Sequence, residues 1–438
     1  MLNQTARIIS TYSADTFGVC SALFELGGMV VIHDPSGCNS TYTTHDEPRW
    51  YDHDSMIYVS ALNEQNAILG NDERLLAETI ETVRQQQPAF VCLIASQIPF
   101  MIGTDMQALA RIIAQKTGVP AFTLPTNNMH YYAQGAWYAF RHLAEHITRA
   151  TQGQEAFWAK NYADWQPAKT PKDGQLRLNL LGVTPQDFSI NGSDTSLRQW
   201  AEEHDFYVQS CWAMGSSLAE IEHSTTADVN LVLSYGGLGA AAVMAQACGI
   251  PYVVGVPIGA MREVLAQNVQ QATDKHGSSP VCQETTPSAP DGSPFPKGTA
   301  SGYTTYLRHD APSPCLHNYA SACQGASASL LIGESVYAQS LARALESATG
   351  QHYRVIVPME TDDALLLPDT LRVTDEVDLE PLFQHAGTII GDPMYAPIMP
   401  KSARFVSLPH EGFSGRLYEH QIPDLIAPHG FVQFVTQL

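Results

Sequence analysis

Residues 30–42, VVIHDPSGCNSTY, place a cysteine directly after a short apolar run and a tight turn. Val30 to Ile32 have the composition of a buried β-strand, and Pro35 to Gly37 have that of a sharp turn. Cys38 therefore stands where the chain leaves a predicted strand. A thiol in that position can bind a metal, act as a nucleophile or fill a small apolar space, and these residues alone leave the three roles open.

The segment that follows Cys38 is dense in ionisable and aromatic side chains. It has the sequence THDEPRWYDHD over residues 44–54 and contains His45, His53 and Asp54, which we name as candidate catalytic residues. Such groups can donate protons or contact a substrate. A solvated polar loop would have the same composition, so the role of the segment depends on where the fold places it.

Two histidines farther along the chain are also candidates. His130 precedes two tyrosines after a predicted strand and could line a cavity. His410 lies in the C-terminal run SLPHEGFSGRLYEHQ, together with Glu411, Arg416 and His420. For His410 we consider a catalytic or cofactor-binding role beside the simpler one of a buried, hydrogen-bonded histidine.

The cysteines are scattered along the chain. There are 8 of them and no CxxC pair, which excludes the commonest zinc and ferredoxin spacings but not a site assembled from distant segments. Cys20 opens an apolar helical run, CSALFEL, so its thiol faces either an interface or the core. For the other six the simplest role is packing or partial exposure, and these are Cys92, Cys211, Cys248, Cys282, Cys315 and Cys323.

The composition excludes several classes of protein. The chain has 438 residues, of which 44% are hydrophobic and 15% charged, as expected for a globular chain of two or three domains. Its net charge of -21 argues against a nucleic-acid partner, because nucleic-acid binding needs a basic surface. The N-terminus does not resemble an export signal, and the cysteine content then favours a reducing compartment. We therefore expect a cytoplasmic protein with no membrane span.

The chain contains three successive blocks in which short β-rich runs alternate with turns and amphipathic helices. In the helix predicted over Asp72–Gln86, for example, Leu75, Ile80 and Val83 share one face. This alternation predicts an α/β fold of doubly wound, Rossmann-like parallel sheets. The predicted strands are Met29–His33, Met56–Ala61, Ala89–Ala95, Val119–Leu124, Arg177–Val183, Phe206–Gln209, Val229–Ser234, Pro251–Val256, Ser329–Gly333, Arg354–Pro358, Gly387–Gly391 and Arg404–Leu408.

These blocks divide the chain into three α/β domains. They are predicted to span residues 1–158, 176–272 and 315–438, and a Ser-, Pro- and Gly-rich insertion loop occupies residues 273–314. Ligands of doubly wound sheets bind at the carboxyl ends of strands. Cys38 stands just past the carboxyl end of the first predicted strand and is therefore in the position of a site residue.

Several segments, taken in order along the chain, resemble the component 1 subunits of the nitrogenase superfamily. The strand-and-turn signature of that family corresponds here to His33-Asp34-Pro35-Ser36-Gly37-Cys38. The family includes nitrogenase α and β chains, cofactor-assembly scaffolds, and the light-independent protochlorophyllide and chlorophyllide reductases. Further family-like segments are Leu69–Leu75, Ile102–Asp105, Gly215–Ile221, Ala227–Leu233, Gly249–Tyr252, Leu331–Glu334 and Ile390–Pro393.

The resemblance implies three domains of the nitrogenase component 1 type and a two-component reductase. In the family, a separate ATP-hydrolysing iron protein delivers electrons to an iron–sulfur cluster, expected here as [4Fe-4S], at the interface of two component 1 subunits. Some members pass the electrons on to a second cofactor or to a tetrapyrrole, so a second metallocofactor stays open. This chain has no GxxxxGK[ST] loop, and any ATPase of that type is therefore a separate protein.

The cysteine pattern departs from that of the nitrogenase subunits, which supply three cysteines each to the shared cluster. Only the middle one is present here, as Cys38. By the family pattern the third position falls at about Gln97, with Ser96 beside it, and the first falls near Ser13 or Ala14. Cys20 lies between the first and second positions. The resemblance therefore makes Cys38 and Cys20 candidate metal ligands, with Ser13 and Gln97 as further candidate cofactor contacts.

A single cluster cysteine implies a partner that supplies the remaining ligands. In the light-independent protochlorophyllide reductase, one subunit gives three cysteines and its partner gives a single ligand, an aspartate, at the position that matches Cys38. We therefore expect a paralogous component 1 subunit in a heterodimer or heterotetramer, with a homodimer as the second option.

Three functional hypotheses follow. The first is a subunit of a nitrogenase-like iron–sulfur oxidoreductase that reduces a small molecule or tetrapyrrole. Dinitrogen is not the expected substrate, because the cysteine set is incomplete and the chain is short for a nitrogenase subunit. The second is a scaffold that assembles a metallocofactor and hands it on. The third is a cluster-free binding protein on the same fold, since fold does not fix function.

Overall fold

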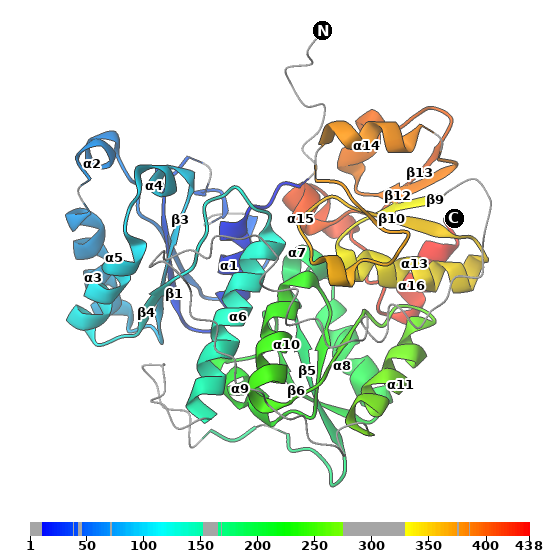
Figure 1. Cartoon of the computed structure of the whole chain (residues 1–438), viewed down its shortest axis with the longest axis horizontal. Coiled ribbons are helices and arrows are strands. Elements are labelled where there is room, and N and C mark those ends of the chain that lie inside the picture. Colours follow the sequence, from blue (N-terminus) through cyan, green and yellow to red (C-terminus); the bar gives the residue numbers. More distant parts are fainter. Residues whose placement is uncertain are drawn as a thin grey trace.

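Three parallel β-sheets form the framework of the protein. The computed structural model describes residues 11–37, 39–42, 46–70, 72–151, 165–167, 169–274, 329–374, 376–384 and 386–438. The strand orders are β2-β1-β3-β4, β6-β5-β7-β8 and β11-β10-β9-β12-β13. In Figure 1 the three units meet around α7 and α15, near the centre of the view. The predicted α/β fold of doubly wound parallel sheets is confirmed.

The first sheet is covered by helices on both faces. Alternate residues of its central strand point to opposite sides, so that Val30 and Ile32 pack into one core and Met29 and Val31 into another. The predicted helix over Asp72–Gln86 is confirmed as α3, which buries the predicted apolar face. The unit comprises α1 (Asp15–Leu23), β1 (Met29–His33), β2 (Met56–Val59), α2 (Glu64–Leu69), α3 (Glu73–Gln86), β3 (Val91–Ala95), α4 (Gln97–Ile102), α5 (Met106–Thr117), β4 (Ala121–Thr123) and α6 (Tyr132–Thr151).

The second sheet has the same strand order as the first. Its most apolar stretch forms α10, ends at Gly249 in a left-handed conformation with a φ of 71°, and continues into β8. Strand β8 lies within the predicted strand Pro251–Val256. The unit comprises β5 (Leu176–Leu181), α7 (Pro185–Phe188), α8 (Ser193–Glu203), β6 (Phe206–Cys211), α9 (Leu218–Glu222), η2 (His223–Thr226), β7 (Val229–Val232), α10 (Tyr235–Cys248), β8 (Tyr252–Val254) and α11 (Met261–Asp274).

The third sheet has one strand more than the sequence predicted. The additional strand, β11, is two residues long and pairs with β10 at one edge, so it is too short to produce a sequence pattern. The unit comprises β9 (Ser329–Ile332), α13 (Ser335–Thr349), β10 (Tyr353–Val357), η5 (Asp363–Leu365), β11 (Leu371–Arg372), α14 (Glu376–Phe383), β12 (Thr388–Gly391), η6 (Pro393–Ile398), β13 (Arg404–Ser407), α15 (Glu411–Ser414), η7 (Gly415–Gln421) and α16 (Pro428–Val435).

The three sheets draw their strands from the three predicted segments, whose boundaries stay predictions. The predicted insertion over residues 273–314 lies almost entirely outside the described residues, because α11 ends at Asp274 and the description resumes at Ser329. No helix within the described ranges combines the length and the apolar character needed to cross a membrane.

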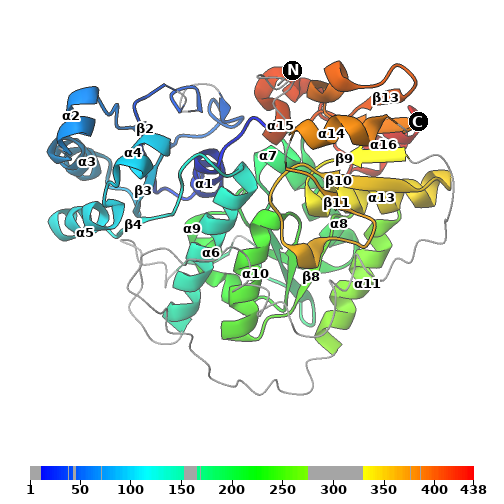
Figure 2. The same ribbon diagram turned by 45° about the horizontal axis from the view of Figure 1, so that its top comes forward.

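The N-terminal segment and the C-terminal unit are joined through their backbones. The N–H of Tyr12 donates to the carbonyl of Phe413 at 3.0 Å, and the N–H of Ser13 donates to that of Gly412 at 3.2 Å. The carbonyl of Ser13 in turn accepts a hydrogen bond of 3.0 Å from the N–H of Tyr132 at the start of α6. Residues 12–13 therefore bridge the first and third units (Figure 2).

Two glycines allow α1 and α6 to cross at close range. A Cβ atom on Gly18 would lie 1.8 Å from the carbonyl oxygen of Tyr132, and one on Gly135 would lie 1.8 Å from that of Asp15. Both obstacles are backbone atoms, which cannot rotate away as a side chain can. The contact therefore requires glycine on each helix.

We predict that Gly135→Ala destabilises the protein by about 3 kcal/mol, the upper range for overpacking a core. Urea denaturation followed by circular dichroism measures the change. Gly37→Ala is the control, since a Cβ there meets no atom within 4 Å, and it is expected to shift stability by no more than about 0.5 kcal/mol. Equal effects of the two substitutions would contradict the close crossing.

Candidate functional site

The carboxyl ends of β1 and β3 mark the switch point of the first sheet, because the strands beyond this pair are added in opposite directions. His33 ends β1, and its Nδ1 lies 2.7 Å from Oγ of Ser60, directly after β2. Ser36 has a φ of 74°, as a sharp turn requires. The candidates Cys38 and His45 lie outside the described residues. The turn that leads to Cys38 therefore begins at the edge of the sheet where ligands bind.

The residue after Cys38 is buried among polar groups. Oδ1 of Asn39 lies 3.1 Å from Oγ1 of Thr16 and accepts a hydrogen bond of 3.4 Å from Nδ2 of Asn128. Nδ2 of Asn39 is buried and has no partner among the described residues. Asp15, on the same helix as Thr16, accepts a backbone hydrogen bond of 2.9 Å from Asn128, and burial raises the pKa of its carboxyl to about 6. A buried polar layer from α1 and the loop after β4 thus surrounds Asn39, the residue that follows Cys38 in the sequence.

The other candidate cluster contacts have different surroundings. Cys20 is fully buried in α1, and burial raises the pKa of its thiol well above the usual value, which favours packing over ligation. Gln97 is exposed at the start of α4. Beside it, Ser96 is buried, and its Oγ has no partner among the residues that the structure covers. Ser13 is buried next to α15. Their roles at a cluster stay predictions.

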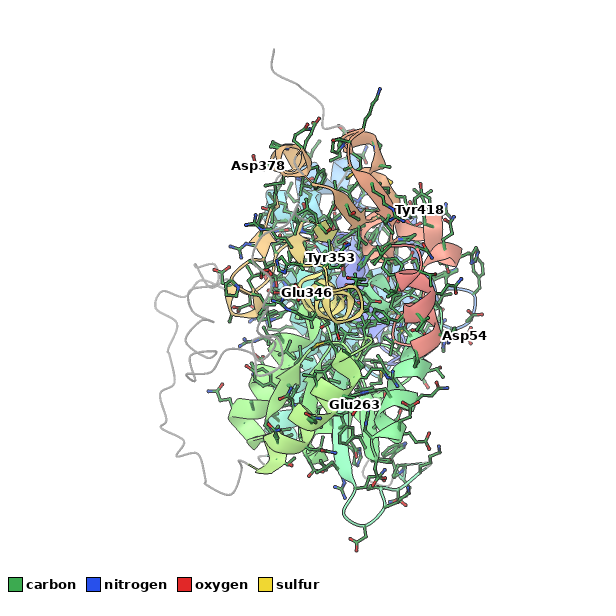
Figure 3. All side chains as sticks on the ribbon, turned by 90° about the vertical axis from the view of Figure 1, so that its right-hand side faces the viewer. Asp54, Glu263, Glu346, Tyr353, Asp378 and Tyr418 are labelled. Atoms are coloured by element: carbon green, nitrogen blue, oxygen red, sulfur yellow. The ribbon has the colours of Figure 1, made fainter. Side chains whose placement is uncertain are left out.

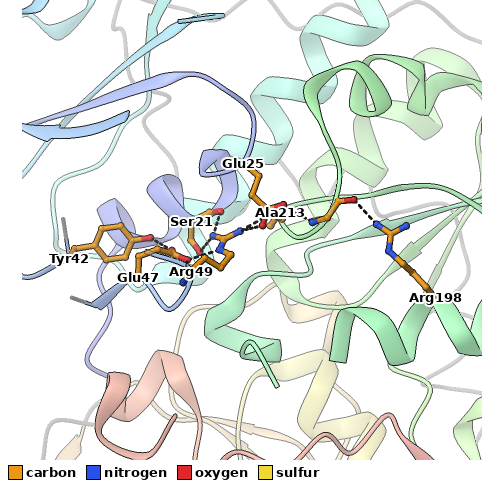
Figure 4. A network of polar contacts seen from close by, with 8 residues as sticks. Ser21, Glu25, Tyr42, Glu47, Arg49, Arg198 and Ala213 are labelled. Carbon is orange, nitrogen blue, oxygen red and sulfur yellow. Dashed lines mark hydrogen bonds and ion pairs between the residues drawn. The ribbon is translucent and has the colours of Figure 1, made fainter. Parts of the chain in front are cut away.

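Part of the acidic and aromatic segment after the first turn joins the first unit to the second. Arg49 and Glu47 are buried, and Nε of Arg49 donates to Oε1 of Glu47 at 2.6 Å (Figure 4). Nη1 of Arg49 donates to the carbonyl of Ala213 at 2.8 Å and to Oε1 of Glu25 at 2.9 Å. The other oxygen of Glu25 accepts a hydrogen bond of 2.7 Å from the N–H of Gly215. These charges hold two units together.

The two described catalytic candidates of the same segment lie at the surface, whereas His410 is largely buried. His53 and Asp54 are exposed, and Asp54 is at the outer edge in Figure 3. Asp46 instead faces the third unit, because its Oδ2 accepts a hydrogen bond of 2.9 Å from Tyr12 and its Oδ1 lies 3.6 Å from Nε of Arg416. The segment and the C-terminal run therefore meet through Asp46.

A second set of polar side chains lies where the three units meet. We call it the junction site, and it consists of Tyr132, Asp187, Glu334, His410 and Glu411. Tyr132 begins α6, Asp187 lies in α7 after β5, Glu334 precedes α13 after β9, and the last two residues follow β13. Carboxyl ends of strands from the second and third sheets therefore converge at the place where ligands of doubly wound folds bind.

Asp187 is the centre of the junction site. Its Oδ1 accepts a hydrogen bond of 2.5 Å from the hydroxyl of Tyr132, and its Oδ2 accepts one of 3.2 Å from Thr184. Nε2 of His410 lies 3.6 Å from the same Oδ1. Both ring nitrogens of His410 are buried without a hydrogen-bond partner among the described residues, and the ring stacks on Phe413 at 4.3 Å between centroids.

Glu334 joins the N-termini of two helices. Its Oε1 accepts a hydrogen bond of 2.9 Å from the N–H of Tyr235, the first residue of α10. Its Oε2 accepts bonds of 2.9 Å from the N–H groups of Val336 and Tyr337 in the first turn of α13. Burial raises the pKa of Glu334, whereas these hydrogen bonds act in the opposite direction and favour the carboxylate. The negative charge of Glu334 therefore affects the ionisation of its neighbour Asp187.

Burial sets the protonation of the other junction groups. Burial, with the charge of Glu334, raises the pKa of Asp187 well above its usual value. Burial lowers the pKa of His410 to about 3. Burial, with nearby carboxylates such as Glu419 and Glu47, raises the pKa of Glu411 to about 8. At pH 7 the imidazole is therefore neutral and Glu411 carries a proton, so Asp187 and His410 do not form an ion pair.

The junction site borders a small cavity. Its volume is about 20 Å³, and Asp187, Ser189, His410 and Glu411 are among its lining residues. That space accommodates one molecule the size of water. Neither carboxyl oxygen of Glu411 has a partner among the described residues. Protonated carboxyls beside a neutral imidazole can transfer a proton to a small molecule in the cavity.

Sequence reasoning found part of the junction site. It named His410 but not Asp187, which lies in a helix of only four residues with no distinctive pattern. Glu334 carries a usable signal, because it follows an apolar strand directly and ends a family-like segment. His130 does not line the cavity. Its Nδ1 lies 3.1 Å from Oε1 of Glu360, and that contact raises the pKa of His130. The second tyrosine after it belongs to the junction site.

The described residues alone do not form a complete metal site. Among them there is no group of three or more His, Cys, Asp or Glu side chains placed to hold a metal ion. This finding does not cover Cys38, which is not among the described residues. An iron–sulfur cluster at the first sheet would thus need Cys38 together with ligands from a further segment or another chain.

A comparison with family models decides the relationship. Residues 16–267 match the family described as nitrogenase component 1 type oxidoreductase, and this range is more than half of the chain. The chain belongs to this family. The predicted membership of the nitrogenase component 1 superfamily is confirmed.

Curated members of the family resemble the chain over part of its length. The nitrogenase molybdenum-iron protein alpha chain of Azospirillum brasilense is 25% identical over 51% of this chain and 45% of its own length. The nitrogenase iron-molybdenum cofactor biosynthesis protein NifE of Klebsiella pneumoniae is 24% identical over 45% of this chain and 41% of its own length. The matches thus span less than half the length of these relatives.

Solved structures of the component 1 type share the whole fold. A structure of nitrogenase Cp1 at pH 6.5 covers 100% of this chain and 95% of its own, with a TM-score of 0.59 and 12% identity. A second structure, at pH 5, covers 99% of this chain and 90% of its own, with a TM-score of 0.60 and 12% identity. At this identity the likeness concerns the fold alone.

The proton on Glu411 predicts a pH dependence of stability. In the folded protein burial raises the pKa of Glu411 to about 8, whereas the pKa of a glutamate exposed to water is 4.5. Ionisation of the unfolded chain above 4.5 therefore favours unfolding, so the stabilising contribution is complete below that pH and is lost as the pH rises to about 8. Glu411→Gln cannot titrate. Its free energy of unfolding should rise relative to the unchanged protein by up to about 1.4 kcal/mol per pH unit in this window.

Urea denaturation at several pH values between 5 and 8 measures this difference. Glu64→Gln, at an exposed position on α2, is the matched control because it removes a carboxyl without touching the junction site. A difference between Glu411→Gln and the unchanged protein that stays constant with pH would show that Glu411 is already ionised when buried.

Proposed function

We propose that the chain is one subunit of an iron–sulfur oxidoreductase of the nitrogenase component 1 type, which takes electrons from an ATP-hydrolysing iron protein. The observation that carries the proposal is the junction site, where Asp187, Glu411 and a neutral His410 surround a cavity. A reduction that receives single electrons also needs protons, and these groups are poised to supply them. The substrate class is a small unsaturated molecule or a tetrapyrrole, not dinitrogen.

The size of the cavity bears on the substrate. A space of about 20 Å³ accommodates a molecule the size of water, so a tetrapyrrole would need the units around the junction site to separate. His410 is the proposed proton donor or acceptor toward the substrate. Asp187, 3.6 Å from its Nε2, is the group that exchanges a proton with it. His45, His53 and Asp54 remain proposals for contacts with substrate or partner on the side of the first unit.

The cluster belongs at Cys38, between this chain and a paralogous component 1 subunit. Members of the family bind iron–sulfur clusters and work with paralogous subunits and an iron protein. Cys38 would supply a thiolate, and Ser13, Gln97 and Cys20 remain the other candidate contacts from this chain. One feature supports a shared site: the chain has one cysteine of the family pattern.

An apolar surface supports a partner at the same end of the first sheet. Helices α2 and α4 follow the carboxyl ends of β2 and β3 (Figures 1 and 2). Both helices expose large apolar side chains, for example Leu69, which is 77% exposed, and Met101, which is 71% exposed, and exposed apolar patches often mark contacts between proteins. We call this the α2–α4 surface, and it comprises Ile68, Leu69, Ile98, Phe100, Met101 and Ile102.

A second function is favoured by the relatives. Two of the curated proteins that match the chain are named as NifE, a cofactor biosynthesis protein. A scaffold that assembles a metallocofactor and hands it on would use the same fold and the same cluster cysteine without turnover. Reduction of a substrate over many turnovers, with the iron protein present, separates the reductase from the scaffold, which would release its cargo once.

We predict that iron and acid-labile sulfide appear in anaerobically purified protein when the chain is co-expressed with its paralogue. Cys38→Ala should remove both, together with the electron paramagnetic resonance signal of the reduced cluster, because a thiolate ligand is lost. Cys248→Ala, far along the chain in α10, is the control and should retain the iron. A parallel Cys20→Ala variant tests the second candidate ligand. Folded protein without iron in every preparation would leave a cluster-free binding protein.

We predict that Met101→Asp weakens association with the paralogue by about tenfold or more, because a charge in a buried apolar contact loses at least 1.4 kcal/mol. Analytical ultracentrifugation of the mixed subunits measures the association. Val432→Asp is the control, since Val432 is 62% exposed on α16 in the third unit. If both variants associate as the unchanged chain does, the α2–α4 surface is not the contact.

A further inference from the structure

Two histidines on successive turns of α6 face each other. His142 and His146 are four residues apart, and their Nε2 atoms are 2.9 Å apart. The rings are inclined by 71°, with centroids 4.3 Å apart. Both side chains are half-buried. They lie at least about 15 Å along the helix from Tyr132 at its start, so they are separate from the junction site.

Packing fixes the position of the pair. The ring of His142 stacks on Phe122 of β4, with 4.1 Å between centroids and an angle of 25°. The helix holds the two Cα atoms at the i, i+4 spacing that brings side chains together on one face. The two nitrogens therefore converge without the ordering cost that flexible side chains would have.

The separation of the nitrogens suits two neighbouring positions on a metal ion. Imidazole nitrogens bind divalent transition metals at about 2.0–2.1 Å. Two such bonds at a right angle place their nitrogens about 2.9 Å apart, the arrangement found in tetragonal Cu(II) and Ni(II) sites. The observed 2.9 Å is the length of a hydrogen bond between the rings, and it is also compatible with this arrangement, so a metal ion could bind with little movement of the two side chains.

Both rings are neutral at pH 7. Burial lowers the pKa of His142 well below its usual value, and it lowers the pKa of His146 to about 4, with a further contribution from the charge of Arg149. Without a metal, one Nε2 donates a hydrogen bond to the other. A metal ion takes the place of that single proton, which moves to Nδ1 of the same ring. The charge of Arg149 opposes binding, but Glu145 lies 3.9 Å from it and offsets part of the repulsion.

We propose that His142 and His146 form a two-histidine chelate for a divalent transition-metal ion of the Cu(II) or Ni(II) type, with water or small anions in the remaining coordination positions. The site stands on α6 and β4 alone. It requires neither the iron–sulfur cluster nor the partner subunit of the proposed reductase.

Equilibrium dialysis of the full chain against Ni(II), with glycine as a competing ligand, tests the site. The unchanged protein should bind one Ni(II) at this site. His146→Gln should lower the affinity by about tenfold or more, because one of the two imidazole ligands is lost. His429→Gln removes an exposed histidine on α16 and should leave the affinity unchanged. His146 is chosen because His142→Ala would also remove the stacking on Phe122.

A second measurement counts the nitrogen ligands directly. Electron paramagnetic resonance of the protein with one equivalent of Cu(II) should show an axial spectrum with superhyperfine splitting from two nitrogens, and His146→Gln should lose one of them. Circular dichroism confirms that each variant is folded. Equal Ni(II) affinity in the unchanged protein and His146→Gln, or a Cu(II) spectrum that the substitution does not alter, would overturn the proposal.

Discussion

The buried carboxylate of Glu334 is the contact on which the meeting of the second and third sheets depends. The first N–H groups of a helix have no partner within the helix, and here one side chain satisfies such groups on both α10 and α13. Removal of the carboxylate would leave the N-termini of two helices unpaired in the core. Its negative charge also favours the protonated form of Asp187. Glu334 therefore both joins the second and third sheets and influences the protonation of Asp187.

The first unit is held by a different kind of contact. Arg49 is buried with two glutamates and reaches the backbone of the second unit, so its guanidinium is fully paired where water is excluded. A buried ion pair of this kind contributes little net stability but is very costly to break singly, because the remaining charge would be left unpaired. The orientation of the first unit thus depends on this charged contact in addition to the apolar core that the three units share.

Much of the framework could be predicted from sequence because each central strand is a short apolar run followed by a turn. Met29–His33 and Val229–Val232 are fully buried strands of this kind, and their burial on both faces is why the runs are mostly apolar and do not alternate. The two-residue strand β11 left no such pattern.

The sites were harder to predict, because their character arises from burial and from partners distant in sequence. Asp187 is an ordinary aspartate until Tyr132 and Glu334 lie beside it. The segment around Glu47 and Arg49 suggested solvated or catalytic groups, since composition alone does not distinguish an exposed charge from one paired inside an interface. His142 and His146 were not predicted as a site, because a pair of histidines indicates metal binding only when the fold brings their ring nitrogens together.

The backbone pairing of Tyr12 and Ser13 with Phe413 and Gly412 has a consequence for the order of events in the cell. A ribosome extends a chain from the N-terminus at about 5–20 residues per second, and domains generally fold as they emerge. The partners of residues 12 and 13 are made long after residues 12 and 13 themselves. The first unit can thus fold while the third unit is still being synthesised. During that interval the first unit lacks its contacts with the third, and cofactor insertion or encounter with a partner has a window that closes when the third unit folds.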